Sequence, residues 1–179
     1  FMQGGARAQF GAVPMNLLTD SKKADFIHTG SWTKYAIKEI KKFGAANIIF
    51  NGEENKFKSI PDLTKIKTSP DAEYLYICTN NTIEGTKINP GNIPKTNLPL
   101  VADMSSNIFS EVYDMSKFSL IFAGAQKNLG IAGVAAIIIK DELTEKSNEN
   151  IPEMLSYKNM KSSESMLNTP PVFAVYVLN

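Results

Sequence analysis

Four short apolar runs limit the possible folds of this chain more than any other feature. They read EYLYICT, LPLVADMSS, FSLIFAG and GVAAIIIK, and they begin at residues 73, 98, 118 and 133. Each contains a candidate strand, and its unbroken apolar character predicts burial on both faces of a sheet. Amphipathic segments alternate with such runs along the chain. The sequence therefore predicts an α/β fold with a mostly parallel sheet flanked by helices.

The first half of the chain fits the same pattern. A strand is expected over Ala24–Gly30, and Ser31 is the candidate N-cap of a helix over Trp32–Phe43. Gly44 is expected to end that helix. The remaining expected elements are a strand over Asn47–Phe50, a short helix over Ser59–Ile66 and a loop over Gly85–Asn97.

The charge of the chain argues against two classes of partner. The 179 residues include 19 Lys and Arg against 18 Asp and Glu, which gives a formal net charge of +1. That balance provides no electrostatic footprint for nucleic acid or for an anionic membrane surface. No apolar stretch approaches the roughly 20 residues that span a bilayer. We therefore expect neither nucleic acid nor a membrane as a partner.

The single cysteine indicates a reducing compartment. One cysteine forms no intrachain disulfide, and Cys78 lies in an apolar run. A small buried thiol is expected there rather than a nucleophile. A cytoplasmic location fits this cysteine usage.

Both ends of the sequence resemble interior positions of a longer chain. FMQGG reads as the exit of a strand, and TPPVFAVYVLN stops within an expected apolar helix. No internal repeat and no interdomain linker are visible between them. We expect residues 1–179 to form one domain of a larger protein.

Polar clusters follow the apolar runs at the points where strands end. They are GGAR near the N-terminus, TNNT after YLYIC, DMSS after LPLVA and GAQKN after LIF. Ligands of open α/β sheets bind beyond the carboxyl ends of the strands. We therefore expect the four clusters to converge on one edge of the sheet and to form the functional site.

Two of these clusters suggest binding groups. Residues Gln3–Leu18 form a glycine-rich turn that leads into a helix, which suits a phosphate, with Arg7 as a charged donor. An ordinary turn is the alternative, because no P-loop or GxGxxG motif is present. Asp103 ends a buried strand and needs a donor or cationic partner. That partner is either a protonated pyridinium nitrogen or the turn that Asp103 caps.

Lys127 stands among small residues at the exit of the next apolar run. Ala123, Gly124 and Ala125 leave room for a flat ring. A lysine that forms a Schiff base needs a partly desolvated amine, so that it loses its proton near neutral pH. An exposed turn lysine is the alternative.

The only tryptophan and the only histidine complete the list of candidates. By residue type alone, Trp32 is expected to pack in the core rather than to stack on a bound ring. His28 has no visible partner for a metal site or a catalytic triad, so we expect a structural role. No metal site and no serine hydrolase are expected.

Six motifs occur in an order and spacing that one known family shares. They are GGARAQF, GSW, NNTIEGT, VADMSS, FAGAQKNLG and LNTPP, and AGAQKN together with NTPP is specific to that family. Over essentially its whole length, the chain resembles the phosphoserine aminotransferases. These are fold-type I enzymes that depend on pyridoxal 5′-phosphate, in the group that includes the cysteine desulfurases.

The resemblance implies roles for individual residues. Lys127 resembles the Schiff-base lysine, and Asp103 resembles the partner of the pyridinium nitrogen. Trp32 resembles the aromatic residue stacked on the cofactor ring, which reverses the expectation of core packing. The further cofactor-binding residues implied are Ala6, Arg7, Thr82, Gln126, Asn168 and Thr169, of which the last two reach the cofactor phosphate of the neighbouring subunit of a homodimer.

The resemblance also implies an activity. The family transfers an amino group from glutamate to 3-phosphohydroxypyruvate, giving O-phosphoserine and 2-oxoglutarate for serine biosynthesis, and some members act in vitamin B6 synthesis. Family members are longer than this chain. Residues 1–179 are therefore expected to be part of the cofactor-binding large domain, without the N-terminal segment and the C-terminal small domain. Those absent parts carry the arginine for the substrate carboxylate.

Other functions remain open at this point. A cysteine desulfurase or an alanine–glyoxylate-type aminotransferase would share Lys127 and Asp103 without needing GGARAQF or LNTPP. A non-catalytic α/β module would use the polar clusters only as caps and turns. A nucleotide-binding module is weakened by the missing phosphate motifs.

Overall fold

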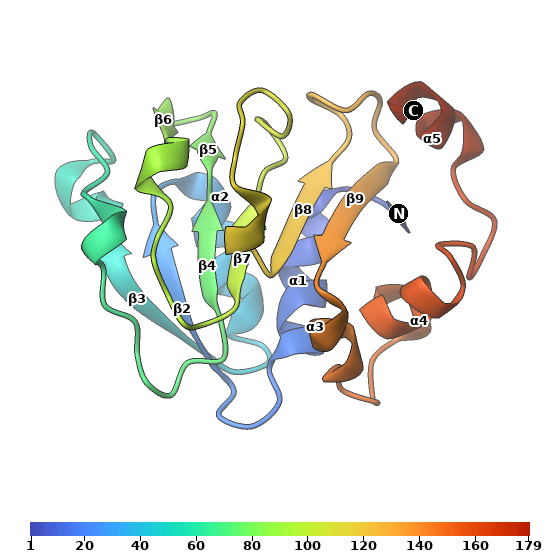
Figure 1. Cartoon of the computed structure of the whole chain (residues 1–179), viewed down its shortest axis with the longest axis horizontal. Helices are drawn as coiled ribbons and strands as arrows, with labels where there is room; N and C mark the ends of the chain where they lie inside the picture. The colour runs from blue at the N-terminus through green and yellow to red at the C-terminus, as the bar shows by residue number, and fades with distance from the viewer.

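The computed structural model describes residues 1–179 and is built on one central sheet. Its strands are β1 (Met2–Gln3), β2 (Lys23–His28), β3 (Ala45–Asn51), β4 (Leu75–Cys78), β7 (Leu100–Asp103), β8 (Leu120–Gly124) and β9 (Val134–Ile139). They form seven strands in the order β1-β9-β8-β7-β4-β2-β3. The strands from β3 to β8 pair in parallel, whereas β9 pairs antiparallel with β8 and with β1. The predicted mostly parallel sheet is confirmed (Figure 1).

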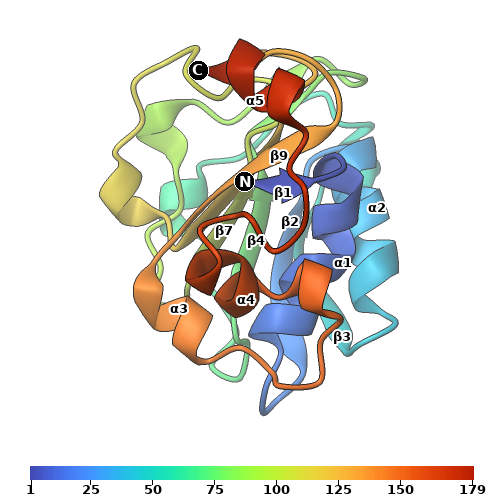
Figure 2. The same cartoon turned by 90° about the vertical axis from the view of Figure 1, so that its right-hand side faces the viewer.

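Five α-helices and a small hairpin accompany the sheet. They are α1 (Ala6–Leu17), α2 (Ser31–Ile40), α3 (Asp141–Glu145), α4 (Tyr157–Ser162) and α5 (Val172–Leu178), with the hairpin strands β5 (Asn80–Asn81) and β6 (Thr86–Lys87). Figure 2 shows α4 and α5 on the flank of the molecule beside β1. None of these helices combines the length and the apolarity that a bilayer crossing requires.

Two apolar layers enclose the sheet. On one face α1 and α2 pack on Phe26, Tyr76 and Phe122, which are all buried. The ring of Phe122 meets Phe10 of α1 edge-on, with centroids 6.0 Å apart. The other face is covered by loops and 3₁₀ turns, which contribute Leu63, Ile88, Ile93, Ile108 and Phe118. Both layers bury strand residues, as the continuous apolar runs predict.

The last strand is an exception to the expected burial on both faces. Ile138 of β9 is 44% exposed. The loop layer on that face contains no residue of β9. The apolar run alone does not reveal that this layer ends at β8.

The start of α2 differs from the expectation by one residue. Gly30 is the N-cap, and Ser31 is the first helical residue. The backbone N–H and the hydroxyl of Ser31 donate to Glu84 Oε1 at 2.8 and 2.6 Å. A Cβ at Gly30 would lie 2.5 Å from Glu84 Oε2. A glycine is needed because this distant carboxylate caps the helix.

The helix expected over Ser59–Ile66 is wrong. Only Leu63–Lys65 turns, as a 3₁₀ segment, and the Asp62 side chain caps it by accepting from Thr64 N at 3.1 Å. Asp62 and Ile66, on either side of this turn, are both extended, so the helix does not continue in either direction. The loop expected over Gly85–Asn97 contains the short strand β6 and one 3₁₀ turn.

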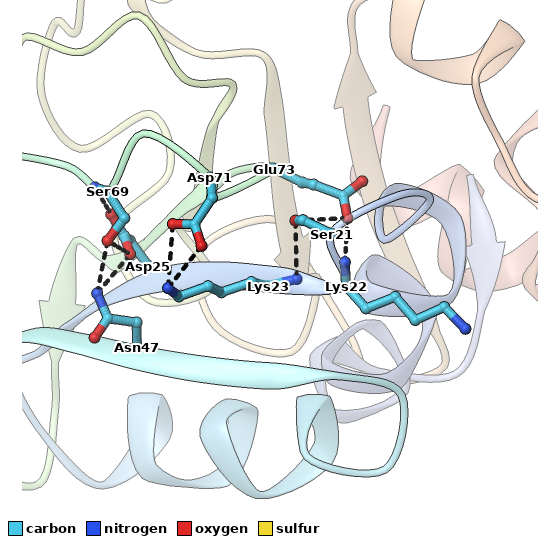
Figure 3. A network of polar contacts seen from close by, with 8 residues as sticks. All are labelled: Ser21, Lys22, Lys23, Asp25, Asn47, Ser69, Asp71 and Glu73. Carbon is cyan, nitrogen blue, oxygen red and sulfur yellow. Dashed lines mark hydrogen bonds and ion pairs between the residues drawn. The ribbon is translucent and has the colours of Figure 1, made fainter.

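A polar network fastens the amino ends of the strands (Figure 3). The buried Asp25 carboxylate accepts from Asn47 Nδ2 at 2.8 Å and from Ser69 N at 2.6 Å. Glu73 accepts from the backbone N–H groups of Thr19 and Lys22 at 2.6 and 2.7 Å. Burial opposes ionisation of Glu73, but these donors outweigh it and lower its pKa. The network fixes the edge of the sheet opposite to the polar clusters.

Candidate active site

The four polar clusters converge on one cavity at the carboxyl edge of the sheet. The cavity has a volume of about 560 Å³ and is lined by Gly4, Gly5, Ala6, Arg7, Phe10, Trp32, Cys78, Asn80, Asp103, Ser105, Ser106, Gln126, Lys127, Ala132 and Gly133. Two successive antiparallel pairings, β8 with β9 and β9 with β1, make β1 run in the same direction as β8. The glycine turn after β1 therefore meets the exits of the parallel strands.

The N-terminus of α1 forms one wall of the cavity. Its N-cap, Gly5, offers no side-chain cap, and the first turn contains no acidic residue. Gly4 has φ +94°, which glycine adopts without strain, and its N–H donates to Gly133 O at 3.0 Å. The Arg7 guanidinium lies 4.4 Å from the centroid of the Tyr35 ring. Free N–H groups, the helix dipole and Arg7 together favour an anion here.

Asp103 supplies the one buried acid of the cavity. It ends β7, and its carbonyl accepts from Thr79 N at 3.0 Å and from Thr79 Oγ1 at 3.1 Å. Ser105 N donates to Asp103 Oδ1 at 2.9 Å. Burial raises the pKa of Asp103, while the bonds from Ser105 and the charge of Lys127 act in the opposite direction. The carboxylate therefore favours a cationic or proton-bearing ligand.

Lys127 is joined to Trp32 through one hydroxyl group. Lys127 Nζ and Trp32 Nε1 each lie 3.3 Å from Thr82 Oγ1, to which both donate. Lys127 Nζ also lies 5.3 Å from the centroid of the Trp32 ring. Trp32 is half-buried and lines the cavity while it packs against the core. The Thr82 hydroxyl thus holds the Lys127 amine and the Trp32 indole next to each other.

The expected partial desolvation of Lys127 is not observed. Its side chain is exposed, because the turn after β8 lies on the open side of the cavity. Of the small residues before Lys127, which were expected to leave room for a flat ring, Gly124 instead allows close packing of the backbone. A Cβ at Gly124 would lie 2.5 Å from Gln126 Oε1 and 3.1 Å from Ala6 N. Glycine at this position lets the exit of β8 approach the start of α1.

Three of the implied cofactor residues do not line this cavity. Thr82 lies beside it, bonded to Lys127 and Trp32, whereas Asn168 and Thr169 lie away from it. Asn168 lines a second cavity of about 420 Å³ beside β1 and α5, together with Phe1 and Val172. The carbonyl of Thr169 accepts a hydrogen bond from the Gln3 amide. Within one chain, neither Asn168 nor Thr169 lines the cavity of Lys127.

His28 also lies away from the cavity. It is buried, and its Nε2 is 3.5 Å from Glu53 Oε1. Burial lowers its pKa, and the hydrogen bond to Glu53 only partly offsets that effect. Its ring packs edge-on against Phe57 with centroids 5.2 Å apart. These contacts agree with the expected structural role.

Four cavity side chains that carry a thiol, amide or hydroxyl group were not singled out as ligands from the sequence. They are Cys78, Asn80, Ser105 and Ser106. For three of them the available signal was their position directly after strands, in the clusters TNNT and DMSS, whereas Cys78 is the last residue of β4. Cys78 pairs in register with Asp103, and burial, with that carboxylate, raises the pKa of its thiol. Cys78 is therefore an inert buried thiol, as expected.

Comparison with known proteins shows the family of the chain. The sequence model of the aminotransferase class-V family matches residues 1–179. The phosphoserine aminotransferase of Desulfotalea psychrophila is 51% identical over 178 residues, which are 99% of this chain and 49% of that protein. The chain thus spans about half the length of the curated relatives it matches.

Solved structures agree with this result. The phosphoserine aminotransferase from Bacillus circulans subsp. alkalophilus superposes with a TM-score of 0.94 at 38% identity, over 99% of this chain and 49% of that one. The pyridoxal-phosphate-bound phosphoserine aminotransferase from Trichomonas vaginalis gives a TM-score of 0.88 at 36% identity, over 99% and 53%. The fold, the cavity and the family match lead to one conclusion: the chain belongs to the aminotransferase class-V family.

Proposed function

We propose that residues 1–179 are part of the cofactor-binding large domain of a phosphoserine aminotransferase. The observation that carries the proposal is the cavity that gathers Lys127, Asp103 and the start of α1. The names of the relatives at about 50% identity support it. The longer protein would transfer the amino group of glutamate to 3-phosphohydroxypyruvate, giving O-phosphoserine and 2-oxoglutarate for serine biosynthesis. A related reaction of vitamin B6 synthesis belongs to the same proposal.

The residues of the cavity fit pyridoxal 5′-phosphate. The uncapped start of α1, with Ala6 and Arg7, suits the phosphate group. Trp32 offers a flat face to an aromatic ring. The hydrogen bond that Asp103 receives is made at Oδ1, which leaves Oδ2 for a protonated ring nitrogen. Lys127 supplies an amine for the aldehyde, and Gln126 and Thr82 supply polar contacts beside it.

The chemistry follows from the residue types at these positions. When bound, pyridoxal phosphate supplies an electron sink for the charge that develops at the substrate α-carbon. The ionised Asp103 carboxylate keeps a proton on the ring nitrogen, because the opposite charges stabilise each other in a buried place. Lys127 Nζ would act as the general base that takes the proton from the substrate α-carbon and delivers it to the cofactor carbon that had carried the aldehyde. Thr82 Oγ1 holds that nitrogen beside the Trp32 ring.

The proposal includes a homodimer in which Asn168 and Thr169 serve the site of the neighbouring subunit. Their place outside the cavity of their own chain supports this assignment. Exposed apolar residues on α5, including Phe173 and Tyr176, provide a surface that association would cover. A cytoplasmic location belongs to the same proposal and agrees with the free buried thiol of Cys78.

The alternative functions predict different properties for the same cavity. Another fold-type I enzyme would share Lys127 and Asp103, but the relatives at about 50% identity are named phosphoserine aminotransferases. A non-catalytic α/β module predicts that Lys127 reacts like any surface lysine. A binding measurement separates that module from a cofactor-binding domain.

Titration with pyridoxal phosphate tests the proposal. Trp32 is the only tryptophan, so its fluorescence reports on the cavity alone. We expect saturable quenching with one site per chain. Pyridoxal, which lacks the phosphate, should bind about 10-fold or more weakly, because it loses charge-assisted hydrogen bonds at α1.

The controls are simple. Trp32→Phe should abolish the signal without abolishing binding, which equilibrium dialysis measures. Quenching that never saturates, or equal affinities for pyridoxal and its phosphate, would contradict the proposed cofactor site.

A further inference from the structure

Ser105 connects the strand exits that carry the two principal residues of the cavity. Its backbone N–H donates to Asp103 Oδ1 at 2.9 Å, at the exit of β7. Its hydroxyl oxygen accepts from Gly124 N at 3.1 Å, at the exit of β8. Gly124 lies three positions before Lys127. One buried residue, 8% exposed, thus bonds to both strand exits, to β7 through its backbone N–H and to β8 through its hydroxyl.

We propose that Ser105 is a positioning residue that acts through Asp103, holding its carboxylate in the orientation that the cofactor ring nitrogen requires. This role rests on the proposed function. Because the Ser105 hydroxyl oxygen already accepts from Gly124 N, its own hydrogen is free to turn toward the Asp103 carboxylate. A donor so placed favours the ionised form of a buried acid.

The neighbouring serine shows that this arrangement is specific. Ser106 also lines the cavity, but its hydroxyl donates to Asn80 O at 3.0 Å and accepts from Asn80 Nδ2 at 2.8 Å. It makes no bond to Asp103 or to β8. The link between the two strand exits therefore depends on Ser105.

Three other titratable groups influence Asp103. Cys78 and Tyr76 of β4 interact electrostatically with it, and burial raises the pKa of both well above their ordinary values. They stay neutral in the acid range. The charge of Lys127 lowers the pKa of Asp103, as the Ser105 bonds do. We therefore assign the loss of cofactor affinity at acid pH, the acid limb of the binding profile, to protonation of Asp103.

The test compares Ser105→Ala with the unmodified chain by Trp32 quenching with pyridoxal phosphate over a series of pH values. Ser105→Ala keeps the backbone N–H bond to Asp103 Oδ1 and removes only the hydroxyl. Loss of that hydroxyl as a donor to a charged group should raise the Kd about 10-fold near neutral pH. The pKa of Asp103 should rise further, so affinity should be lost at a pH about one unit higher as the solution is acidified. Titration of the cofactor itself is the same for every variant and cancels in the comparison.

Three variants make the comparison specific. Ser105→Thr keeps the hydroxyl and should restore the original acid limb. Ser110→Ala, whose hydroxyl only bonds Asn107 O at 2.7 Å, should bind as the unmodified chain does. In an Asp103→Asn background, Ser105→Ala should change the Kd less than about 2-fold, because the group on which it acts is gone. Should Ser105→Ala fail to fold, Ser105→Cys replaces it with the same expected shift.

The outcomes separate this role from the proposed function. If the unmodified chain does not bind pyridoxal phosphate, the proposed function fails and the role of Ser105 fails with it. If the unmodified chain binds but Ser105→Ala leaves the acid limb unmoved, only the role of Ser105 is overturned. An equal loss of affinity at every pH, in both backgrounds, would likewise show a purely structural serine.

Discussion

Asp103→Asn is expected to weaken pyridoxal phosphate binding by about 10- to 100-fold and to stabilise the free chain. The amide cannot offer a charge to a protonated ring nitrogen, and bonds to charged groups are worth about 1.5–3 kcal/mol. In the free chain, the same carboxylate is buried without a full complement of partners. Replacing it by a neutral group of the same shape removes that cost.

The raised pKa of Asp103 also predicts how the stability of the free chain changes with pH. Burial raises the pKa of Asp103 above its ordinary value of 3.8. The folded chain therefore holds its proton more tightly than the unfolded chain, and stability falls as the pH rises from 3.8 through the raised value. Asp103→Asn should lack this decline. Urea unfolding at a series of pH values, together with Trp32 quenching, measures both effects.

A matched control is available on the opposite edge of the sheet. Asp20 is exposed, and Asp20→Asn should leave both the Kd and the pH profile unchanged. If Asp103→Asn binds the cofactor as tightly as the unmodified chain does, the assignment of Asp103 to the ring nitrogen is wrong.

Phe122→Ala should lower the free energy of unfolding by about 3–5 kcal/mol. Phe122 is fully buried at the middle of β8, edge-on to Phe10 and 6.0 Å from it between centroids. It also contacts Tyr76, with ring centroids 6.3 Å apart. Truncation leaves a cavity that these neighbouring rings cannot fill. Because Phe122 is the register partner of Asp103, the cofactor site should loosen with it.

Urea unfolding followed by circular dichroism measures this loss. Phe109, which is 77% exposed, provides the matched substitution, and Phe109→Ala should change stability by less than about 0.5 kcal/mol. Similar effects of the two substitutions would show that the ring cluster around Phe122 does not hold α1 on the sheet.

Most of the fold could be predicted from short stretches of sequence. The errors in the predicted elements arise from contacts between residues that are distant in the sequence. Continuous apolar runs identified the strands because both faces of most strands are covered. The run of β9 gave no sign that Ile138 is 44% exposed, because its cover depends on where other loops end. Likewise Ser31 resembled an N-cap, but the carboxylate that caps α2 belongs to Glu84, 53 residues away.

The site was predictable in position and only partly in detail. Strand exits indicated where Asp103 and Lys127 would meet, and family motifs supplied Thr82, whose hydroxyl bonds both Lys127 and Trp32. The exposure of Lys127 and the bridge made by Ser105 depend on distances between strand exits. No spacing along the chain encodes those distances.

The most direct test of the cofactor site is to find which lysine forms a bond with pyridoxal phosphate. The chain is mixed with the cofactor, reduced with borohydride and digested, and the modified peptide is identified by mass spectrometry. We expect the label on Lys127, its loss in Lys127→Ala and its retention in Lys140→Ala, since Lys140 follows β9 outside the cavity. A label scattered over many of the lysines, unaffected by Lys127→Ala, would contradict the proposed site.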